Sequence, residues 1–500
     1  MAEASASAAP KPTAEQEEIC GTELSPGQRM VVRAYAGSGK SSTLRFYARR
    51  RPDLPILYLC YNRELAQEAK NSFPENVECR TMHSLAYLTH GVQFNDRTGK
   101  LGNLRPRDVM ERLGLTSPYM GVLVIEVLTN FLNSLDRVIT EEHVPARAPN
   151  RGMMVDMAAR AWRCMQDTGD PLPMPHDGYL KLWAIDEVVH REYSVIFVDE
   201  AQDLNPITSA YAQRMAESRA AGVIMVGDSH QSIYSFRLAV DAIEDAVRDA
   251  DHVRSLTWCF RFGQEIADRA SVVLNRLKDD PVHLVGAGRH QPGLGRVVLG
   301  RTNAGLIRKA ADELIRKPGT KIHYAGTSER DRWSPEKPYR LQEIRDLYEL
   351  FRLCPENVKT PYFRKFRGWS EVQEFVEEAG DIELGAIYRL VEEHREGIPA
   401  LLGAVEKSAV GPAEAALSLS TAHRSKGREW DSAELLDDFK PVWSEKEQLA
   451  ARKSESARRR FAEEVNLLYV AMTRPRMQLK VPRGLERWVD QQLPSLRKSD

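Results

Sequence analysis

The stretch AYAGSGKSS, Ala34–Ser42, places two glycines and a lysine between an apolar run and a helix-forming segment. Gly37 and Gly39 allow the backbone to turn its N–H groups inward, where they can surround phosphate oxygens. Lys40 would bring a positive charge to the outer phosphates, and the Ser41 hydroxyl would bind Mg²⁺. The run RMVVRAY before the loop predicts a strand, and SSTLRFYARRR after it predicts a helix whose N-terminus faces the phosphates. We therefore expect an α/β nucleotide-binding fold with a phosphate loop formed by Ala36, Gly37, Ser38, Gly39, Lys40, Ser41 and Ser42.

A pair of carboxylates ends another expected strand, in the segment VIFVDEAQD, Val195–Asp203. In an open parallel sheet, ligands bind at the carboxyl ends of the strands. For phosphoryl transfer, Asp199 would hold Mg²⁺ and Glu200 would accept a proton from the attacking water. For the loop, the alternative is a plain glycine–serine turn between strand and helix, because Ala34 stands where the full phosphate-loop pattern has glycine. For the carboxylate pair, the alternative is a helix cap.

Composition limits the classes of protein. The chain has 500 residues, which suggests about three domains. Its net charge is −1, so a nucleic acid would have to bind in a local groove. The six cysteines include no CxxC pair, which argues against a zinc site or a disulfide framework and fits a reducing compartment. No apolar run reaches membrane-spanning length, so we expect a cytoplasmic protein, or a nuclear one in a eukaryote, with no membrane partner.

The order of apolar runs predicts two α/β domains, each with a mainly helical insertion. The continuously apolar segments MVVRAY, PILYLCY, SVIFVDE and GVIMVGD are typical of strands buried on both faces of a parallel sheet. A second unit of the same kind begins near Cys259 with the strand GRVVLG. We expect a disordered tail at 1–13, a first domain at 14–84 and 184–258 with an insertion at 85–183, and a second domain at 259–321 and 411–500 with an insertion at 322–410.

Further residues beside these strands suit ATP hydrolysis and base stacking. Gln231 could sense the terminal phosphate or position water, and the flanked aromatic Phe236 could stack on a nucleic-acid base. Phe260 could lie on adenine. Arg261 and Arg474 could act as arginine fingers on the transferring phosphoryl group, and we expect neither in a hydrophobic core. Either arginine alone could equally be a surface ion pair.

Taken together, the motifs resemble those of superfamily 1 DNA helicases of the UvrD/Rep/PcrA type. The matching segments, in family order, are AYAGSGKSS, ILYLCYNRELAQEA, CRTMHSLAY, VIFVDEAQD, VGDSHQSIYSFR, WCFRF, LSTAHRSKGREWD and EEVNLLYVAMTR. Within the superfamily, three stretches most resemble the helicase core of the F-box DNA helicases: HDGYLKLW, PGQRMVVRAYAGSGKSSTL and EWDSAELLDDF. Because no long segment precedes or follows the motifs, we expect neither an F-box with a ubiquitin-ligase role nor an appended nuclease.

The resemblance implies a fold of two RecA-like domains, with ATP and Mg²⁺ in the cleft between them. By this resemblance Gln16 would read adenine, Phe260 would stack on it and Glu429 would contact the ribose. The single-strand track would be lined by Tyr61, Asn62, Met82, His83, Phe236, Thr421 and His423. Three residues depart from the family pattern in regions near these motifs: Leu238, Arg428 and Pro475.

The expected function is an ATP-dependent 3′-to-5′ translocase and helicase acting on single-stranded DNA or a 3′-tailed duplex. Two alternatives stay open. One is a DNA-stimulated remodeller that strips proteins from DNA with little unwinding. The other is an ATP-gated switch subunit of a larger assembly, for instance in genome defence, with a protein partner bound through the insertions.

Overall fold

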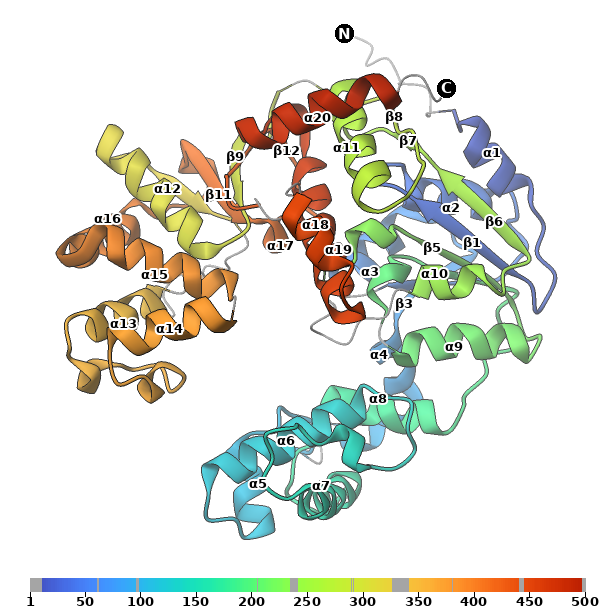
Figure 1. Ribbon diagram of the computed structural model, residues 1–500. Coiled ribbons are helices and arrows are strands. Elements are labelled where there is room, and N and C mark those ends of the chain that lie inside the picture. Colours follow the sequence, from blue (N-terminus) through green and yellow to red (C-terminus); the bar gives the residue numbers. More distant parts are fainter. Residues whose placement is uncertain are drawn as a thin grey trace, which may run out of the picture. The chain divides into compact units, whose positions relative to one another are not determined.

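The computed structural model describes residues 11–60, 63–95, 99–204, 206–233, 242–288, 290, 292–325, 341–379, 381–439 and 445–496. The chain divides into two compact units. The first comprises Met1–Tyr35 and Gly39–Leu256, and the second comprises Thr257–Asp500 together with Ala36–Ser38. Each unit is built on a parallel sheet with helices packed against it (Figure 1). The α/β class predicted from the apolar runs is confirmed.

The first unit contains a six-stranded parallel sheet with strand order β3-β2-β4-β5-β1-β6. The four strands predicted from apolar runs are β1, β2, β4 and β5, and they lie in the interior of the sheet. Strands β3 and β6 form its edges and are partly exposed, so neither carries a continuous apolar run. The bounds are β1 (Arg29–Ala34), β2 (Ile56–Cys60), β3 (Val77–Thr81), β4 (Val195–Val198), β5 (Gly222–Gly227) and β6 (His252–Leu256).

The carboxyl ends of β4, β5 and β1 lie side by side, since these strands are direct neighbours in the sheet. The register pairs Val198 of β4 with Met225 of β5, and Gly227 at the end of β5 with Arg33 of β1. Three polar segments therefore begin at one edge of the sheet: the carboxylate pair after β4, Asp228 after β5 and the glycine loop after β1. This edge is where a ligand is expected in an open parallel sheet.

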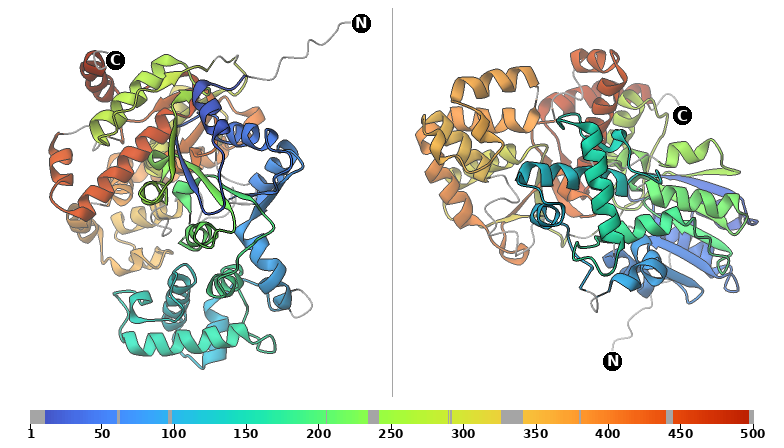
Figure 2. Two further views of the ribbon diagram at one scale, coloured as in Figure 1. Left: turned by 90° about the vertical axis from the view of Figure 1, so that its right-hand side faces the viewer. Right: turned by 90° about the horizontal axis from the view of Figure 1, so that it is seen from below.

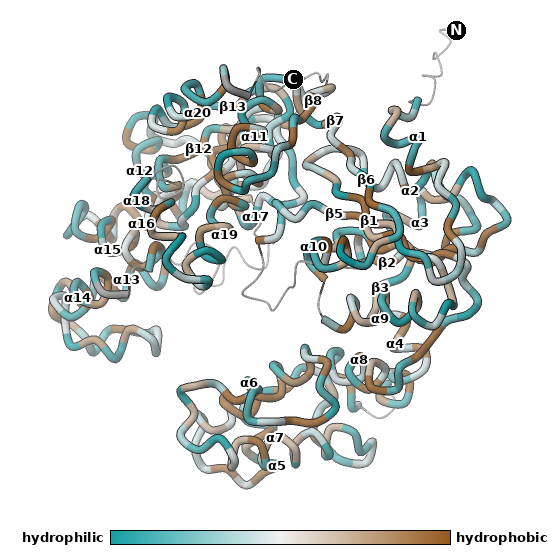
Figure 3. The backbone as a smooth tube through the Cα atoms, turned by 45° about the vertical axis from the view of Figure 1, so that its right-hand side comes forward, coloured by the Kyte–Doolittle hydropathy of each residue, from teal (hydrophilic) through white to brown (hydrophobic). Residues whose placement is uncertain are grey.

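Helices cover both faces of the first sheet. Side chains of α1, α2 and the end of α3 pack on the face that carries Met30, Tyr58 and Phe197. Helices α4, α9 and α10 pack on the opposite face. Because both faces are covered, the central strands β1 and β5 consist mostly of hydrophobic residues, as the colours in Figure 3 show. The bounds are α1 (Ala14–Gly21), α2 (Lys40–Arg49), α3 (Arg63–Ser72), α4 (Met82–Ala86), α9 (Pro206–Glu217) and α10 (Ala242–Val247).

A bundle of helices interrupts the first unit between β3 and β4 (Figure 2). Its buried side chains belong to the same apolar cluster as one face of the sheet, so sheet and bundle share a core. Among the described residues no single helix is long and apolar enough to cross a membrane; only the bent pair α5–α6 passes by length and composition. The bounds are α5 (Pro106–Leu113), α6 (Pro118–Leu132), α7 (Arg151–Gln166) and α8 (His176–Ile185).

The second unit contains a five-stranded parallel sheet with strand order β10-β11-β9-β12-β13. Strand β10 pairs with β11, so the sheet extends beyond residue 321 into the segment expected to be a helical insertion. A separate two-stranded ladder joins β7 to β8. The bounds are β7 (Trp258–Cys259), β8 (Val285–Gly286), β9 (Arg296–Gly300), β10 (Ile322–Tyr324), β11 (Leu417–Thr421), β12 (Trp430–Leu435) and β13 (Pro475–Lys480).

Helices of the second unit fall into two groups. Helices α12 to α16 share an apolar core with β9, β10 and β11. In the other group α19 contacts α11, α17 and α18, and α11 also contacts α20. The charged segment EKEQLAARKSESARRR, Glu445–Arg460, forms α18 and the start of α19. The bounds are α11 (Gln264–Leu277), α12 (Asn303–Arg316), α13 (Leu341–Phe351), α14 (Trp369–Ala379), α15 (Ile382–His394), α16 (Ile398–Ser408), α17 (Ala422–Ser425), α18 (Glu445–Ala451), α19 (Glu455–Met472) and α20 (Arg483–Leu496).

Candidate active site

The glycine loop after β1 has the backbone of an anion-binding turn. Gly37 and Gly39 have φ values of +72° and +79°, in the left-handed region that favours glycine. Gly39 is the N-cap of α2, and no side chain among the described residues caps the first N–H groups of that helix. The Ser38 hydroxyl is buried and has no hydrogen-bond partner among the described residues. A phosphate would satisfy these donors, so the loop fits the expected nucleotide.

Lys40 begins α2 and forms an ion pair with Glu200. Its Nζ lies 2.7 Å from Glu200 Oε2. Burial alone would lower the pKa of Lys40, but the carboxylates of Glu200 and Asp199 outweigh it and raise that pKa above its ordinary value. The lysine is therefore a permanent cation at the place where the loop would receive phosphates. Ser42 follows in the same turn of α2, and its Oγ accepts a hydrogen bond from Arg45 Nη2 at 2.8 Å.

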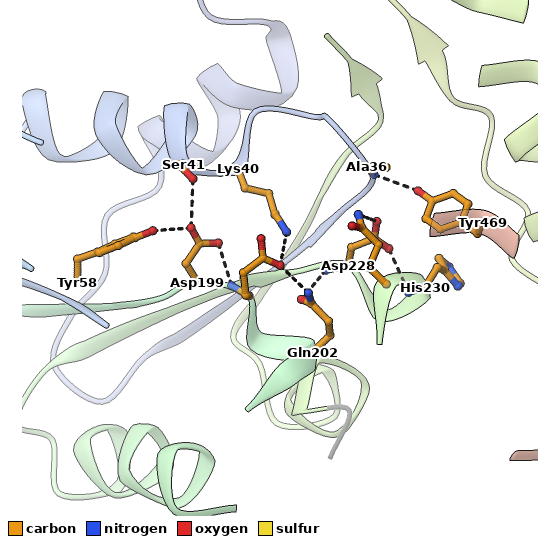
Figure 4. Close-up of polar contacts among 11 residues, drawn as sticks. Ala36, Lys40, Ser41, Tyr58, Asp199, Gln202, Asp228, His230 and Tyr469 are labelled. Atoms are coloured by element: carbon orange, nitrogen blue, oxygen red, sulfur yellow. Dashed lines mark hydrogen bonds and ion pairs between the residues drawn. The ribbon is translucent and has the colours of Figure 1, made fainter. Parts of the chain in front are cut away.

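Asp199 is held by hydrogen bonds at both carboxylate oxygens (Figure 4). Its Oδ2 accepts from the Ser41 hydroxyl at 3.2 Å and from the Tyr58 hydroxyl at 2.6 Å, and its Oδ1 accepts from the Glu200 N–H at 2.9 Å. Burial and the neighbouring Glu200 raise the pKa of Asp199, against the opposing effects of Lys40 and the Tyr58 hydrogen bond. Ser41 and Asp199, predicted as metal ligands from separate motifs, thus come together.

Tyr58 is a member of this site that sequence reasoning missed. Burial and the charge of Asp199 raise the pKa of its hydroxyl, so it stays protonated and donates. The one hint of this role in the sequence is that Tyr58 is the single residue with a polar hydroxyl in the apolar run ILYLC, Ile56–Cys60. Nothing in that run indicates that the tyrosine contacts Asp199, which follows the end of β4.

Gln202 is a second missed residue, and it connects Glu200 to the end of β5. Its Nε2 donates to Glu200 Oε2 at 2.5 Å, and its Oε1 accepts from the Asp228 N–H at 3.0 Å. Asp228 Oδ2 in turn accepts from Gln231 Nε2 at 2.6 Å. A Cβ on Gly227 would lie 2.4 Å from Gln202 Oε1, so only glycine leaves room for this side chain. A continuous polar chain therefore runs from the expected base, Glu200, to Gln231.

Glu200 itself adopts a left-handed backbone, with φ of +51°. For a residue with a Cβ this conformation costs on the order of 1–3 kcal/mol and persists only where the surroundings enforce it. The Lys40 and Gln202 contacts at the Glu200 side chain and the N–H bond to Asp199 supply that enforcement. The strain falls on the residue expected to act as general base.

Gln16, expected to read adenine, is only 3% exposed. Its Oε1 accepts from the Thr13 N–H at 3.0 Å and its Nε2 donates to Thr43 Oγ1 at 3.0 Å. The first bond belongs to a capping box that begins α1, and the second ties α1 to α2. Both amide atoms are already bonded, so reading a base would require one of these bonds to be exchanged.

In the second unit, Arg261 is paired with Glu429. Arg261 Nε lies 2.7 Å from Glu429 Oε1, and its Nη1 donates to the Thr473 carbonyl at 3.3 Å. A Cβ on Gly37 would lie 2.5 Å from Arg261 Cβ. Position 37 therefore requires glycine both for its positive φ and for this close approach. The backbone N–H of Phe260 donates to the Gly37 carbonyl at 2.8 Å, while its ring is 39% exposed and open to a stacking partner.

Arg474 lies in a different environment from the one expected. It is 1% exposed, its Nε donates to the Val470 carbonyl at 2.8 Å, and its Nη2 donates to Thr473 Oγ1 at 3.1 Å. The expectation that neither arginine lies in a core is therefore wrong for Arg474, because it follows Thr473, the C-cap of α19, and hydrogen-bonds to the last turn of that helix. Tyr469, one turn earlier and fully buried, accepts a hydrogen bond from the Ala36 N–H at 3.0 Å.

The residues expected to line a DNA track fall into several environments. His83 Nε2 lies 3.0 Å from Asp177 Oδ1 of α8, whereas Met82 is 5% exposed and packs in the core. Thr421 is buried and caps α17 through a bond from the Arg424 N–H at 3.4 Å. Burial and the charges of Arg301 and Arg424 lower the pKa of His423 to about 4, so it is neutral at physiological pH. Tyr61, Asn62, Phe236 and Leu238 lie outside the described residues.

Comparisons with known proteins cover both units. Residues 123–249 match the model of the UvrD/REP helicase N-terminal domain, and residues 307–482 match that of the UvrD-like helicase C-terminal domain. F-box DNA helicase 1 of Gallus gallus is 32% identical over 95% of this chain and 49% of its own length. F-box DNA helicase protein 1 of Schizosaccharomyces pombe is 27% identical over 93% of this chain and 57% of its own length. The chain thus spans about half the length of these two relatives.

Proposed function

The chain belongs to the UvrD-like helicase family, and from this we propose that it is an ATP-driven motor that moves 3′ to 5′ along single-stranded DNA. The observation that carries the proposal is the convergence of Lys40, Ser41, Asp199 and Glu200 at the carboxyl edge of the first sheet. Lys40 and Ser41 follow β1, whereas Asp199 and Glu200 follow β4, about 160 residues later in the sequence. Their roles in the proposed reaction follow from their contacts.

Ser41 and Asp199 would hold Mg²⁺, which when bound neutralises the charge that develops on the phosphate oxygens during transfer. Lys40 would exchange its ion pair with Glu200 for one with the arriving phosphates. The phosphates supply the negative charge that a largely buried ammonium requires, as the Glu200 carboxylate does before they bind. Glu200 would then be free to orient a water molecule and accept its proton. The bond from Gln202 keeps Glu200 in place after the lysine has moved.

Other residues would complete nucleotide recognition. Phe260 offers an exposed ring for adenine, and Arg261 offers a cation for the transferring phosphoryl group once Glu429 turns to the ribose. Gln231, at the far end of the polar chain from Glu200, would report the state of the terminal phosphate. Arg474 would also bind phosphate, in addition to the structural role that its burial and its hydrogen bond to the Val470 carbonyl indicate.

DNA binding would depend on a local surface, because the net charge of −1 produces no general attraction for a polyanion. His83 and His423 are the described candidates for this surface, and stacking of bases on aromatic rings would supply roughly 1–3 kcal/mol per base. Affinity should fall with salt, with a slope of roughly −0.7 per phosphate neutralised.

The decisive experiment is the ATPase rate of the purified chain with and without single-stranded DNA. We expect strong stimulation, and we expect streptavidin to be displaced faster from the 5′ end of an oligonucleotide than from its 3′ end. Glu200→Gln serves as the matched inactive control. Stimulation with displacement but no duplex unwinding would favour a remodeller. A rate indifferent to DNA would contradict the motor and favour a nucleotide-gated switch.

A further inference from the structure

Tyr58 reaches Asp199 from the neighbouring strand of the first sheet. The register pairs Tyr58 of β2 with Phe197 of β4, two residues before Asp199. From this position the hydroxyl donates to Asp199 Oδ2 at 2.6 Å, the oxygen that also accepts from Ser41 Oγ at 3.2 Å (Figure 4). A hydroxyl-to-carboxylate contact of this length is a strong, charge-assisted hydrogen bond.

Packing around the ring of Tyr58 fixes the position of its hydroxyl oxygen. The side chain is 5% exposed. The Phe73 ring lies 4.6 Å from it, centroid to centroid, and Phe73 in turn lies 6.5 Å from Phe197. In a close-packed interior a ring cannot swing without displacing its neighbours. The hydroxyl is therefore a fixed donor at the edge of the sheet.

Asp199 depends on such donors because it is buried beside a second carboxylate. It is 7% exposed, and its Oδ1 is held by the Glu200 N–H. We propose that Tyr58 is a positioning residue for the magnesium site, holding the Asp199 carboxylate in the orientation in which it faces Ser41. This inference rests on the proposed function, and it adds a residue from β2 to a site otherwise formed after β1 and β4.

A phenylalanine at position 58 would fill the same space, so Tyr58→Phe isolates the hydroxyl. Without it, Asp199 Oδ2 keeps, of its bonds to described residues, the longer one from Ser41, and the carboxylate gains freedom to turn. Groups that orient a metal ligand typically contribute 10- to 100-fold to metal affinity. We therefore expect Tyr58→Phe to weaken binding of the divalent ion about 10-fold.

Tyr47 provides a matched control in the same apolar cluster. It is fully buried in α2, and its hydroxyl has no hydrogen-bond partner among the described residues. Tyr47→Phe therefore makes the same chemical change without removing a hydrogen bond. Its effect on metal binding should be nil.

The test is a titration of Mn²⁺ into the ADP complex of each variant, followed by electron paramagnetic resonance, which requires no turnover. Metal-free binding of a fluorescent ADP analogue checks that each variant folds. We expect weaker Mn²⁺ binding in Tyr58→Phe, wild-type binding in Tyr47→Phe and unchanged metal-free ADP binding in both. With ATP, the Mg²⁺ concentration for half-maximal rate should rise while kcat at saturating Mg²⁺ changes little.

A double variant distinguishes positioning from a general effect on the site. Because Tyr58 acts through Asp199, adding Tyr58→Phe to Asp199→Asn should weaken Mn²⁺ binding no further. Equal Mn²⁺ affinity in wild type and Tyr58→Phe overturns the inference and leaves the proposed function standing. Failure of the wild type to bind Mn²⁺ with ADP overturns the proposed function itself, and this inference with it.

Discussion

The Nζ atom of Lys40 lies 2.7 Å from Oε2 of Glu200, so the lysine expected to bind phosphate forms an ion pair with the expected general base. The pair neutralises a largely buried ammonium and a partly exposed carboxylate at the edge of the sheet, with side chains 13% and 34% exposed. Because of this ion pair, Glu200 is released only when another anion replaces it as the partner of Lys40. Nucleotide binding and activation of Glu200 would then be one event.

Lys40→Ala and Glu200→Gln should both abolish hydrolysis but differ in nucleotide binding. Lys40→Ala removes a contact made to phosphates in the ground state, so the Kd for ATP should rise as well. Glu200→Gln preserves shape and the metal ligands, so ATP should still bind. Equilibrium binding of a fluorescent ATP analogue, beside phosphate release, separates the two. Normal turnover by Glu200→Gln would refute its assignment as the base.

Gln202→Ala should lower kcat with little change in KM for ATP. The amide fixes Glu200 without touching the expected phosphate loop, and misplacing a catalytic group can cost on the order of 10²-fold. Gly227→Ala should produce a similar defect, since its Cβ would displace the Gln202 amide. Gln213→Ala, at an exposed glutamine of α9, is the control and should match the wild type. A wild-type kcat in Gln202→Ala would show that Glu200 needs no such support.

Arg261→Ala and Arg474→Ala should differ in stability although both are expected to reduce hydrolysis. Loss of an arginine finger typically costs on the order of 10³–10⁵ in rate. Arg474→Ala should also lower the free energy of unfolding by about 1–3 kcal/mol, because it leaves the buried Val470 carbonyl without that donor. Urea denaturation measures this difference, with the exposed Arg459→Ala as control. Hydrolysis at the wild-type rate by Arg474→Ala would restrict this residue to a structural role.

His423→Gln should weaken binding of single-stranded DNA by the same factor at pH 6 and pH 8. The pKa of about 4 means that the imidazole is neutral at both values, so it can offer a hydrogen bond but no charge. Fluorescence anisotropy with a labelled oligonucleotide gives the ratio of wild-type to variant affinity at each pH. A ratio that grows towards pH 6 would mean that DNA binding protonates His423.

Lys181 should make the helical insertion more stable as the pH rises above about 8. Burial lowers the pKa of this lysine to about 8 from 10.5, while Asp136 opposes the shift. The folded state then binds fewer protons than the unfolded state between these values, so stability rises with pH in that window. Urea denaturation at pH 7.5 and 9.5 should show the wild type gaining stability relative to Lys181→Met. No relative gain would mean that the buried amine keeps its proton.

Local sequence patterns were enough to predict the central strands and the chemical groups of the expected nucleotide site. Strands β1, β2, β4 and β5 are buried on both faces and therefore appear as continuous apolar runs, whereas the half-exposed β3 and β6 carry no such run. The glycine loop with Lys40 and the pair Asp199–Glu200 are local motifs, because loop and strand geometry needs those residue types at neighbouring positions. Their meeting follows from the adjacency of β1, β5 and β4, a topology typical of parallel sheets.

The side chains that support these groups could be identified only in the folded chain. Tyr58 touches Asp199 because the register of β2 on β4 brings together residues 141 positions apart, and no local pattern encodes that register. The burial of Arg474 likewise depends on the packing around α19, since an arginine after an apolar helix looks the same in sequence whether it faces solvent or the interior. Local motifs specify chemistry over a few residues, whereas positioning contacts form between strands and helices that meet only in the folded chain.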